Sequence, residues 1–412
     1  MNKLSKGTTR VTWIIAFLLF FLTSPYFFWQ WYGNLFVNIL ISTVAMLLIW
    51  IYASRPTGKQ ESILVFYVIV WAFFLFNEFV KGARMGVLAY VPYVLLGFVP
   101  LINKDVGKKV FNNFATAYAI LIGLSMVFWI AAMSGMISPI GQFGEEIAEN
   151  FEREHRTYMV YPFALVGISD FSDFIRFCGF YNEAGVVGTL AGILLSALRF
   201  NMKDWRCIIL LFSGLLSTSM FFYGLAAVYW LSELLLVKKK VGYLFLVLIG
   251  VAVFYGATRN NKTVSSLVWD RFEWNSQEGR FAGSTRGGER EQAAMNTMIA
   301  SGEIWFGVKD KDAYWRDYYG TSSIYSVFAM YGVIFVTLYV IWLLRVGFSY
   351  KKNNWDYLLF CFVIIGCMYQ RPNLFSLPYT FLFVCAARYY EFEMNKKELS
   401  KEKKMLIRTF SK

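Results

Sequence analysis

Apolar residues fall into twelve runs along the chain, separated by short polar stretches and by two long ones. The runs cover residues 11–29, 35–52, 63–79, 87–102, 110–133, 186–198, 207–216, 224–237, 241–254, 324–344, 358–369 and 377–387. A helix that crosses a bilayer needs about 20 mostly apolar residues. The pattern predicts an all-α polytopic membrane protein with about twelve transmembrane helices, in which residues 1–412 form a single membrane domain.

Composition supports this fold class. Hydrophobic residues make up 57% of the 412 residues and charged residues only 16%, whereas roughly 25% of the residues in an ordinary soluble domain are charged. A soluble enzyme, a nucleic-acid-binding module and a receptor with one membrane anchor are therefore excluded. The net charge of +13 does not indicate a nucleic-acid partner, because in a polytopic protein the positions of Lys and Arg matter more than their sum.

Basic residues alternate between the two sides of the predicted topology. Most of the 40 Lys and Arg residues lie on the side of the N-terminus, which predicts that both termini are cytoplasmic. The weakest join is at residues 217–219, where the sequence Ser-Thr-Ser separates two short runs. A single bent helix there would reverse the orientation of everything that follows. The lysines at 238–240 and the basic tail argue for two helices.

Two long loops remain on the non-cytoplasmic side, residues 134–182 and 256–321. The basic residues predicted on this side are mostly arginine, whereas the cytoplasmic set is mostly lysine. Orientation needs only positive charge, but the planar guanidinium suits bidentate binding of phosphate or carboxylate. Arginines that simply pair with acidic residues on the same side are the alternative explanation.

The chain has few residues suited to a metal site, a catalytic triad or a set of disulfides. His155 is the single histidine, and it lies in a stretch, residues 145–156, whose pattern predicts an amphipathic helix over the membrane surface. A histidine-based zinc site and a Ser-His-Asp triad are therefore not expected, and no metal or cofactor is predicted. The five cysteines suggest no disulfide framework. Gly185, Gly188 and Gly192 have helical spacing, which predicts close helix packing.

The first segment with candidate chemistry lies where the first long loop returns to the membrane. It holds Arg176, Gly179 and Glu183, followed by an apolar helix. Charge at a membrane boundary inside a helix bundle is costly, so it is usually functional or paired. A salt bridge between Arg176 and Glu183 that anchors the loop is the structural alternative.

The second segment begins near residue 283 and leads into a predicted helix that extends to Ser301. Arg286 and Arg290 are four residues apart and are expected on one face near the N-terminus of that helix. Two guanidinium groups and free backbone N–H groups there would form a diphosphate cradle. A solvated helix face is the competing explanation.

These motifs resemble the Wzy-type O-antigen and capsule polymerases, which share a superfamily with the O-antigen ligases. The resemblance rests on the two long outer loops, on Arg176-x-x-Gly179-x-x-x-Glu183 before a glycine-rich helix, and on the later arginine helix followed by Phe-Gly-Val at 306–308 and a serine-rich return to the membrane. The topological likeness covers the whole chain. Specific residues match only in residues 176–192 and about 286–332.

The resemblance implies a GT-C-like glycosyltransferase of the bacterial inner membrane with two periplasmic loops. Such enzymes transfer a growing glycan from undecaprenyl diphosphate to a new lipid-linked repeat unit, sometimes with a chain-length regulator as partner. Arg176 and Arg290 would hold the diphosphate, and Arg286 is less securely aligned. The ligases carry a histidine where this chain has residues 320–325, Gly-Thr-Ser-Ser-Ile-Tyr. That departure favours a polymerase and leaves the base unidentified.

The chemistry requires neutralisation of the leaving diphosphate and a group that accepts the proton of the attacking hydroxyl. Glu183 is the first candidate for the base and Glu289 the second, while Tyr319 or Tyr325 would orient the acceptor. An O-antigen ligase and a lipid-linked glycan flippase or other transporter are the alternatives. A transporter should carry charges near the bilayer midplane. Away from the two long loops, the charges that lie in or beside apolar runs are limited to Glu78, Arg84 and Glu233.

Overall fold

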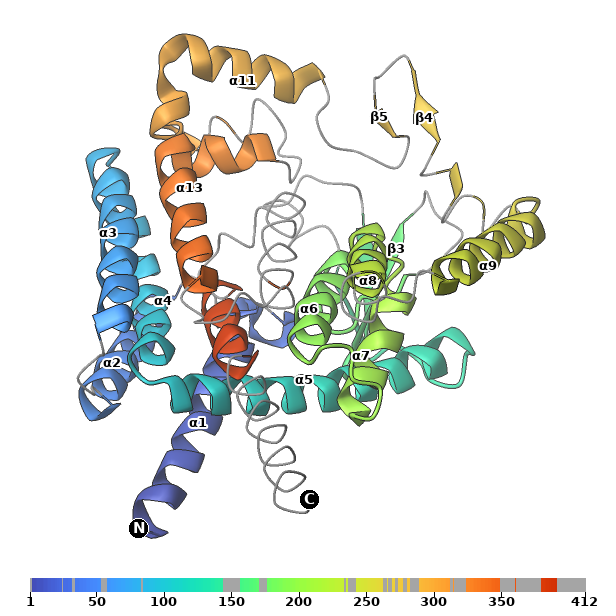
Figure 1. Ribbon diagram of the computed structural model, residues 1–412, viewed down its shortest axis with the longest axis horizontal. Coiled ribbons are helices and arrows are strands. Elements are labelled where there is room, and N and C mark those ends of the chain that lie inside the picture. The colour runs from blue at the N-terminus through green and yellow to red at the C-terminus, as the bar shows by residue number, and fades with distance from the viewer. Residues whose placement is uncertain are drawn as a thin grey trace, which may run out of the picture.

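The computed structural model describes most of the chain. It covers residues 2–23, 25–31, 34–52, 58–82, 84–143, 156–169, 176–232, 242–261, 289–311, 324–348 and 379–390, with short pieces at 235, 265, 269–270, 273–276, 280–281, 314 and 360. Over these residues the chain is mostly helical (Figure 1).

The helices are α1 (Asn2–Leu22), α2 (Leu35–Tyr52), α3 (Gly58–Val80), α4 (Arg84–Ile102), α5 (Lys104–Met133), α6 (Ala184–Ala197), α7 (Trp205–Leu216), α8 (Met220–Ser232), α9 (Gly242–Thr258), α11 (Glu289–Ser301) and α13 (Ile324–Phe348), with the 3-10 helices η1 (Tyr26–Trp31) and η6 (Glu303–Trp305). Among the described residues, three helical stretches are long and apolar enough to cross a membrane: Ser62–Val80, Asp105–Met133 and Tyr325–Val346. They indicate a membrane protein, as the apolar pattern predicts.

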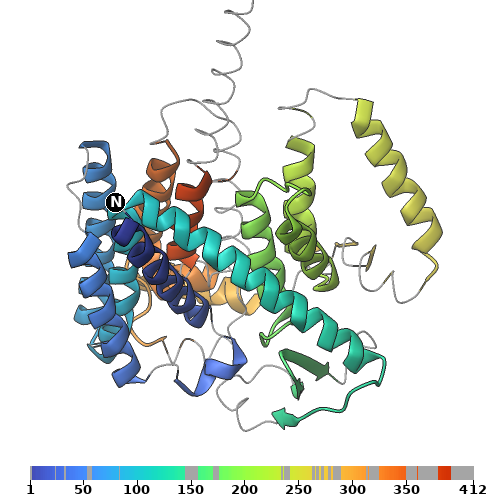
Figure 2. The same cartoon turned by 90° about the horizontal axis from the view of Figure 1, so that it is seen from below.

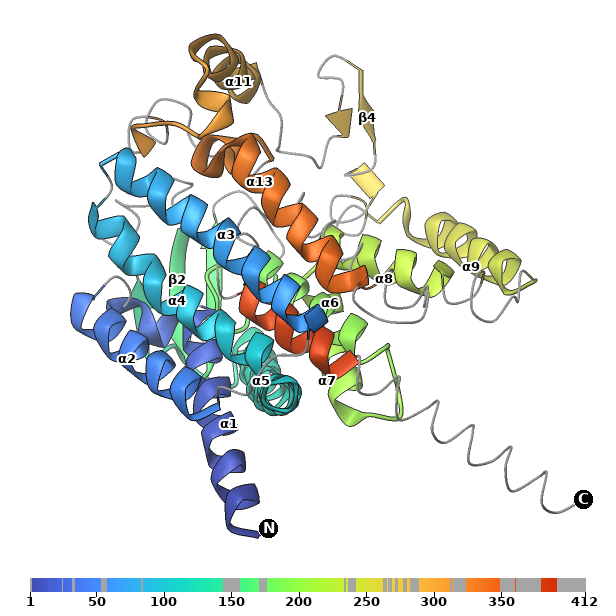
Figure 3. The same cartoon turned by 60° about the vertical axis from the view of Figure 1, so that its left-hand side comes forward.

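The helices form two groups joined by α5. On one side α2, α4, α3 and α13 lie side by side in that order (Figure 3). On the other side α6 packs against α7 and α8, and α9 lies apart at the edge of the molecule (Figures 1 and 2). Seen from below, the long α5 runs beneath both groups with α1 alongside it (Figure 2). Helix α11 lies across the opposite end, above α13 (Figure 1).

Aromatic side chains fill the contact between α3 and α13. Trp71 lies 5.5 Å from Phe335 and 6.0 Å from Tyr339, measured between ring centroids, and both contacts are edge-on. Phe74 lies 5.0 Å from Phe335. Such ring pairs contribute about 0.5–1.5 kcal/mol each beyond the area they bury. Ring contacts therefore hold the two helices together.

The all-α prediction is wrong for the first long loop, which contains a three-stranded antiparallel sheet of β1 (Gly141–Phe143), β2 (Arg156–Tyr161) and β3 (Ala164–Ser169). A two-residue turn joins β2 to β3, because Tyr161 pairs with Ala164. Aromatic and β-branched residues, which favour strands, make up four of the six residues of β2: Thr157, Tyr158, Val160 and Tyr161. A second, short pair joins β4 (Trp274–Asn275) to β5 (Arg280–Phe281) in the second loop. Of the surface helix predicted over residues 145–156, Arg156 instead begins β2, and the rest lies outside the described residues.

The first predicted crossing, residues 11–29, is not one helix. Helix α1 ends at Leu22, and the chain continues as the 3-10 helix η1. Pro25 lies between them, and proline has no backbone N–H with which to extend a helix.

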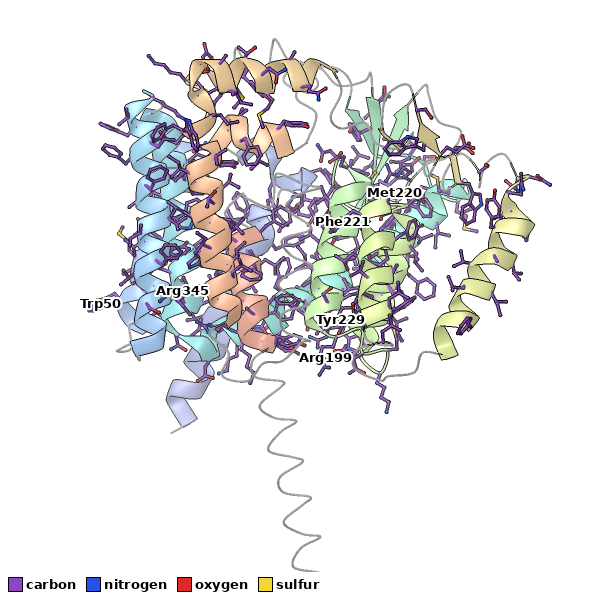
Figure 4. The ribbon with its side chains drawn as sticks, turned by 45° about the horizontal axis from the view of Figure 1, so that its top comes forward. Trp50, Arg199, Met220, Phe221, Tyr229 and Arg345 are labelled. Atoms are coloured by element: carbon purple, nitrogen blue, oxygen red, sulfur yellow. The ribbon has the colours of Figure 1, made fainter. Side chains whose placement is uncertain are left out.

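The predicted break at residues 217–219 is confirmed. Helix α7 ends at Leu216, α8 begins at Met220, and Thr218 between them has a positive φ of 46°. Figure 4 shows Met220 and Phe221 at one end of α8 and Tyr229 near the other end, beside Arg199. Helices α7 and α8 therefore run in opposite directions and form a hairpin that packs on α6.

Candidate functional site

The return segment, residues 176–183, connects the sheet of the first loop to helix α6. Backbone hydrogen bonds tie it to three elements: Leu165 N to Gly179 O (2.7 Å), Phe177 N to Leu216 O (3.2 Å) and Tyr26 N to Phe180 O (3.0 Å). The hydroxyls of Tyr181 and Thr23 also lie 2.9 Å apart. The segment is therefore fixed by β3, by the end of α7 and by the junction of α1 with η1.

Arg176 is half-buried, and its guanidinium holds the turn between α7 and α8. Nε donates to Thr218 Oγ1 at 2.7 Å and to the Ser217 carbonyl at 3.2 Å. Nη2 donates to the carbonyls of Ser217 and Thr218 at 3.1 and 3.2 Å. The last carbonyls of a helix have no partner within the helix, and a cation there is favourable. Arg176 thus caps α7 with a positive charge and fixes the direction of its guanidinium.

Glu183 is the N-cap residue of α6. Its backbone is extended, with φ −138° and ψ 125°, and its side chain is exposed and makes no capping hydrogen bond. Every residue of α6 behind it is buried. A carboxylate at this position is favoured by the positive end of the helix dipole. The structure therefore places both charged residues of the first predicted motif on one short, fixed segment at the start of a buried helix.

Helix α6 and the α7–α8 turn approach too closely for a side chain at Gly188. A Cβ atom there would lie 2.5 Å from Ser219 Cβ and 3.0 Å from Ser217 Oγ. Gly192 faces Leu225 of α8 in the same way, with 3.2 Å to Cδ1. The close packing predicted for these two glycines is confirmed. It brings the turn that Arg176 caps directly onto the first turns of α6.

Gly188→Ala is therefore expected to destabilise the protein by about 1–3 kcal/mol, the usual cost of forcing an extra methyl into a packed core. Gly224→Ala is the matched control, because Gly224 is also in a short apolar helix and has nothing within 4 Å of its Cβ position. That control should be neutral or stabilising, by up to about 1 kcal/mol. Thermal unfolding in detergent measures both. Equal melting temperatures for the two variants would contradict the packing described here.

The second predicted motif is described in part. Helix α11 begins at Glu289, so Glu289 and Arg290 are its first two residues. Tyr325 is the second residue of α13 and is half-buried. Arg286 and Tyr319 lie outside the described residues. The diphosphate cradle of Arg286 and Arg290 stays a prediction, and so does the joint binding of the diphosphate by Arg176 and Arg290 that the resemblance implies.

The structure also brings together a charged group that sequence analysis did not assemble. Glu78 in α3 is buried, and its carboxylate contacts Lys81 at 3.5 Å and Lys311 from the second loop at 2.5 Å. The signal in the sequence was a single glutamate within an apolar run. Its partner Lys311 is 233 residues away, so no local pattern indicated the pair.

Comparisons with known proteins add no family to these observations. No protein-family model, no curated protein and no solved structure matches this chain significantly.

Proposed function

We propose that this chain is a membrane glycosyltransferase that polymerises undecaprenyl-diphosphate-linked oligosaccharide repeat units into O-antigen or a related surface polysaccharide. In this proposal the chain lies in the bacterial inner membrane as a GT-C-like bundle of about twelve helices, with periplasmic loops at residues 134–182 and 256–321. The observation that carries it is the return segment, which holds a half-buried Arg176 and an exposed Glu183 in fixed positions at the start of α6.

In this reaction the protein must neutralise the charge of the leaving group and accept a proton from the acceptor. The acceptor hydroxyl attacks the anomeric carbon of the donor glycan, the bond from that carbon to the diphosphate oxygen breaks, and lipid diphosphate leaves with the electron pair. Guanidinium groups of Arg176 and Arg290 neutralise the charge that grows on the diphosphate. The carboxylate of Glu183 accepts the hydroxyl proton.

The hydrogen bonds of Arg176 support this role because they orient the guanidinium before substrate arrives. A guanidinium that is already oriented needs no reorganisation when negative charge develops on the leaving diphosphate. The acidic candidate follows seven residues later on the same fixed segment. The return segment thus supplies both a cation and a carboxylate at the start of α6.

A specific observation favours the transporter alternative. Helix α13 breaks at Gly332, where φ is 78° and ψ is 154°. Glu78, Lys81 and Lys311 lie beside this break. Lys81 Nζ is 3.0 Å from the Cβ position of Gly307, and Gly307 contacts Gly332. Secondary transporters often hold charges at discontinuous helices. A lipid-linked glycan flippase is therefore the second candidate. O-antigen ligase is the third, although this chain lacks the histidine that the ligases carry at residues 320–325.

Purified protein in lipid vesicles, supplied with undecaprenyl-diphosphate oligosaccharide and EDTA, separates these candidates. Lengthening of the lipid-linked glycan, seen as a ladder on a gel, supports the polymerase. EDTA should not reduce it, because arginine supplies the positive charge. Movement of unchanged units across the bilayer would support the flippase, and transfer to a lipid A core alone would support the ligase. Either of these last two results rejects the polymerase.

The orientation has its own test. Single cysteines at Ser134 and Asn296 should react with a membrane-impermeant thiol reagent in intact spheroplasts, and one at Lys203 should not. All three residues are exposed, and the five native cysteines are replaced beforehand. Figure 4 shows Arg199 and Arg345, both predicted to be cytoplasmic, at the end away from α11. The reverse labelling pattern would place both long loops in the cytoplasm and remove the basis for a periplasmic enzyme.

A further inference from the structure

Glu78 is a carboxylate buried in the last turn of α3. Its side chain is 2% exposed, compared with 9% for Lys81 and 24% for Lys311. An isolated charge at a membrane boundary is costly, so its partners determine whether it is tolerated. Lys81 belongs to the same helix end, but Lys311 comes from the second outer loop. The carboxylate therefore ties this loop to the transmembrane bundle.

The loop is also held by its backbone at the same place. The Phe306 carbonyl accepts hydrogen bonds from Asn77 Nδ2 at 2.7 Å and from Lys81 Nζ at 2.5 Å. Lys311 Nζ lies 6.0 Å from the centre of the Phe74 ring, which adds a cation–π contact. The end of α3 and the turn after it thus contribute an amide, an ammonium, a carboxylate and a ring to one short stretch of the loop, residues 306–311.

This stretch fills the break in α13. Gly307 has φ 82°, and its Cβ position lies 2.7 Å from the Ala329 carbonyl. Gly332 has φ 78°, and its Cβ position lies 2.5 Å from the carbonyl carbon of Phe306. Val308 N donates to the Ala329 carbonyl at 2.7 Å. Only glycine combines positive φ with such close backbone approach, so the stretch is seated tightly between α3 and α13.

Helix α11 also packs against this stretch. Ala294 and Met298 of α11 form a small buried cluster with Val308, Tyr314 and Ala329. Because Val308 belongs to residues 306–311, moving this stretch away from α3 would disturb the cluster that holds α11 in place. Figure 4 shows α11 lying across the end of the bundle above α13.

The two lysines depend on the carboxylate. Burial lowers the pKa of the Lys81 ammonium, the nearby Lys311 lowers it further, and Glu78 opposes both effects. Without Glu78 the two ammonium groups would lose the anion that both contact. The end of α3 would then no longer attract Lys311, and the repulsion between Lys81 and Lys311 would remain.

We propose that Glu78 is a positioning residue that acts through Lys81 and Lys311 to set where helix α11 lies over the bundle. The proposal rests on the proposed function, in which α11 carries Arg290 to the lipid diphosphate. Glu78 itself does not touch the substrate. It controls whether Arg290 is presented at the correct place.

Spin labels test this placement in the full-length protein in lipid nanodiscs. Labels at Val68 on α3 and Asn296 on α11 report the position of α11, and labels at Val68 and Ile341 on α13 report the bundle alone; all three residues are exposed. Glu78→Gln should broaden the first distance distribution and leave the second unchanged. Chain growth should fall by about tenfold or more, since small displacements of positioned groups cost this much. Glu78→Lys combined with Lys311→Glu should restore both the distance and the rate.

Asp105→Asn is the control, because it removes an exposed carboxylate at the start of α5 and should change neither readout. If Glu78→Gln protein is not recovered from the membrane, Lys311→Gln takes its place, because it removes only the loop's own partner and keeps the Glu78–Lys81 pair. An unchanged distance between Val68 and Asn296 overturns the proposal. A broadened distance with undiminished chain growth also overturns it.

If the unaltered protein shows no chain growth, the proposed function fails independently. The distance measurement then still decides whether Glu78 positions α11.

Discussion

Replacing Arg176 with lysine is expected to reduce chain growth by at least about 100-fold, the usual effect of removing one preorganised donor to a developing negative charge. The guanidinium of Arg176 donates in two directions to the α7–α8 turn, through Nε and Nη2. An ammonium group is a point donor and cannot serve the turn while it also matches two phosphate oxygens. The initial rate of polymer formation by purified protein in vesicles, normalised to folded protein, measures the effect.

The structure shows that this variant also loosens the turn, so a matched control is needed. Thr218→Val keeps the shape and the guanidinium but removes the hydroxyl that accepts from Nε at 2.7 Å. It should cost about 1 kcal/mol of stability and leave the rate per folded molecule nearly unchanged. If Thr218→Val lowers the rate as much as Arg176→Lys does, Arg176 acts only by holding the turn.

Arg290→Lys is expected to give the same loss of activity with less effect on the fold. Arg290 is the second residue of α11, and lysine and arginine have nearly equal helix propensities. Arg259→Lys serves as its control, because Arg259 is an exposed arginine that follows α9, outside the proposed site. A normal rate for Arg290→Lys would remove α11 from the diphosphate site.

Replacing Glu183 with glutamine is expected to lower the rate by about 100-fold or more, because glutamine keeps the shape but cannot accept the proton of the acceptor hydroxyl. The fold should survive this change. The Glu183 side chain makes no capping hydrogen bond to α6, and loss of its charge at the helix N-terminus costs only about 0.3–1 kcal/mol. Polymer formation and the melting temperature are measured on the same preparation.

Two outcomes argue against Glu183 as the base. A salt-bridge role predicts lower abundance or stability with activity per molecule retained. Normal polymer from well-folded Glu183→Gln protein would move the base to Glu289, which Glu289→Gln then tests. Asp270→Asn, which changes an exposed carboxylate in the second loop outside the proposed site, should have no effect on the rate.

The loop sheet shows where prediction from local sequence failed. The sequence pattern predicts helices for the apolar runs and polar or helical loops between them, so it does not predict β2. Strand β2 has only six residues, and a strand of this length becomes stable only when it pairs with neighbours such as β1 and β3. Pairing partners are chosen in three dimensions, and the amphipathic pattern of residues 145–156 gave no indication of them.

The local pattern alone predicted the helical membrane character, the break at residues 217–219 and the close packing at Gly188. The first two depend on neighbours within a few turns, because an apolar run and a Ser-Thr-Ser interruption determine the local backbone structure. The helical spacing of the glycines predicted a close contact but not its partners, Ser217 and Ser219 of the α7–α8 turn. Arg176 was identified as a charge at a membrane boundary because it lies shortly before an apolar run. Its partners in the α7–α8 turn, 41 and 42 residues away, were not.

Only the tertiary structure decided that Glu78 meets Lys311 across 233 residues and that Gly307 and Gly332 bring two backbones together. The sequence marked Glu78 as a charge in an apolar run, since its cost depends on the bilayer and not on the fold. Which cation would offset that cost depends on how α3, α13 and the second loop pack. Helix periodicity is a property of adjacent residues, whereas the pairing of buried charges is a property of the assembled bundle.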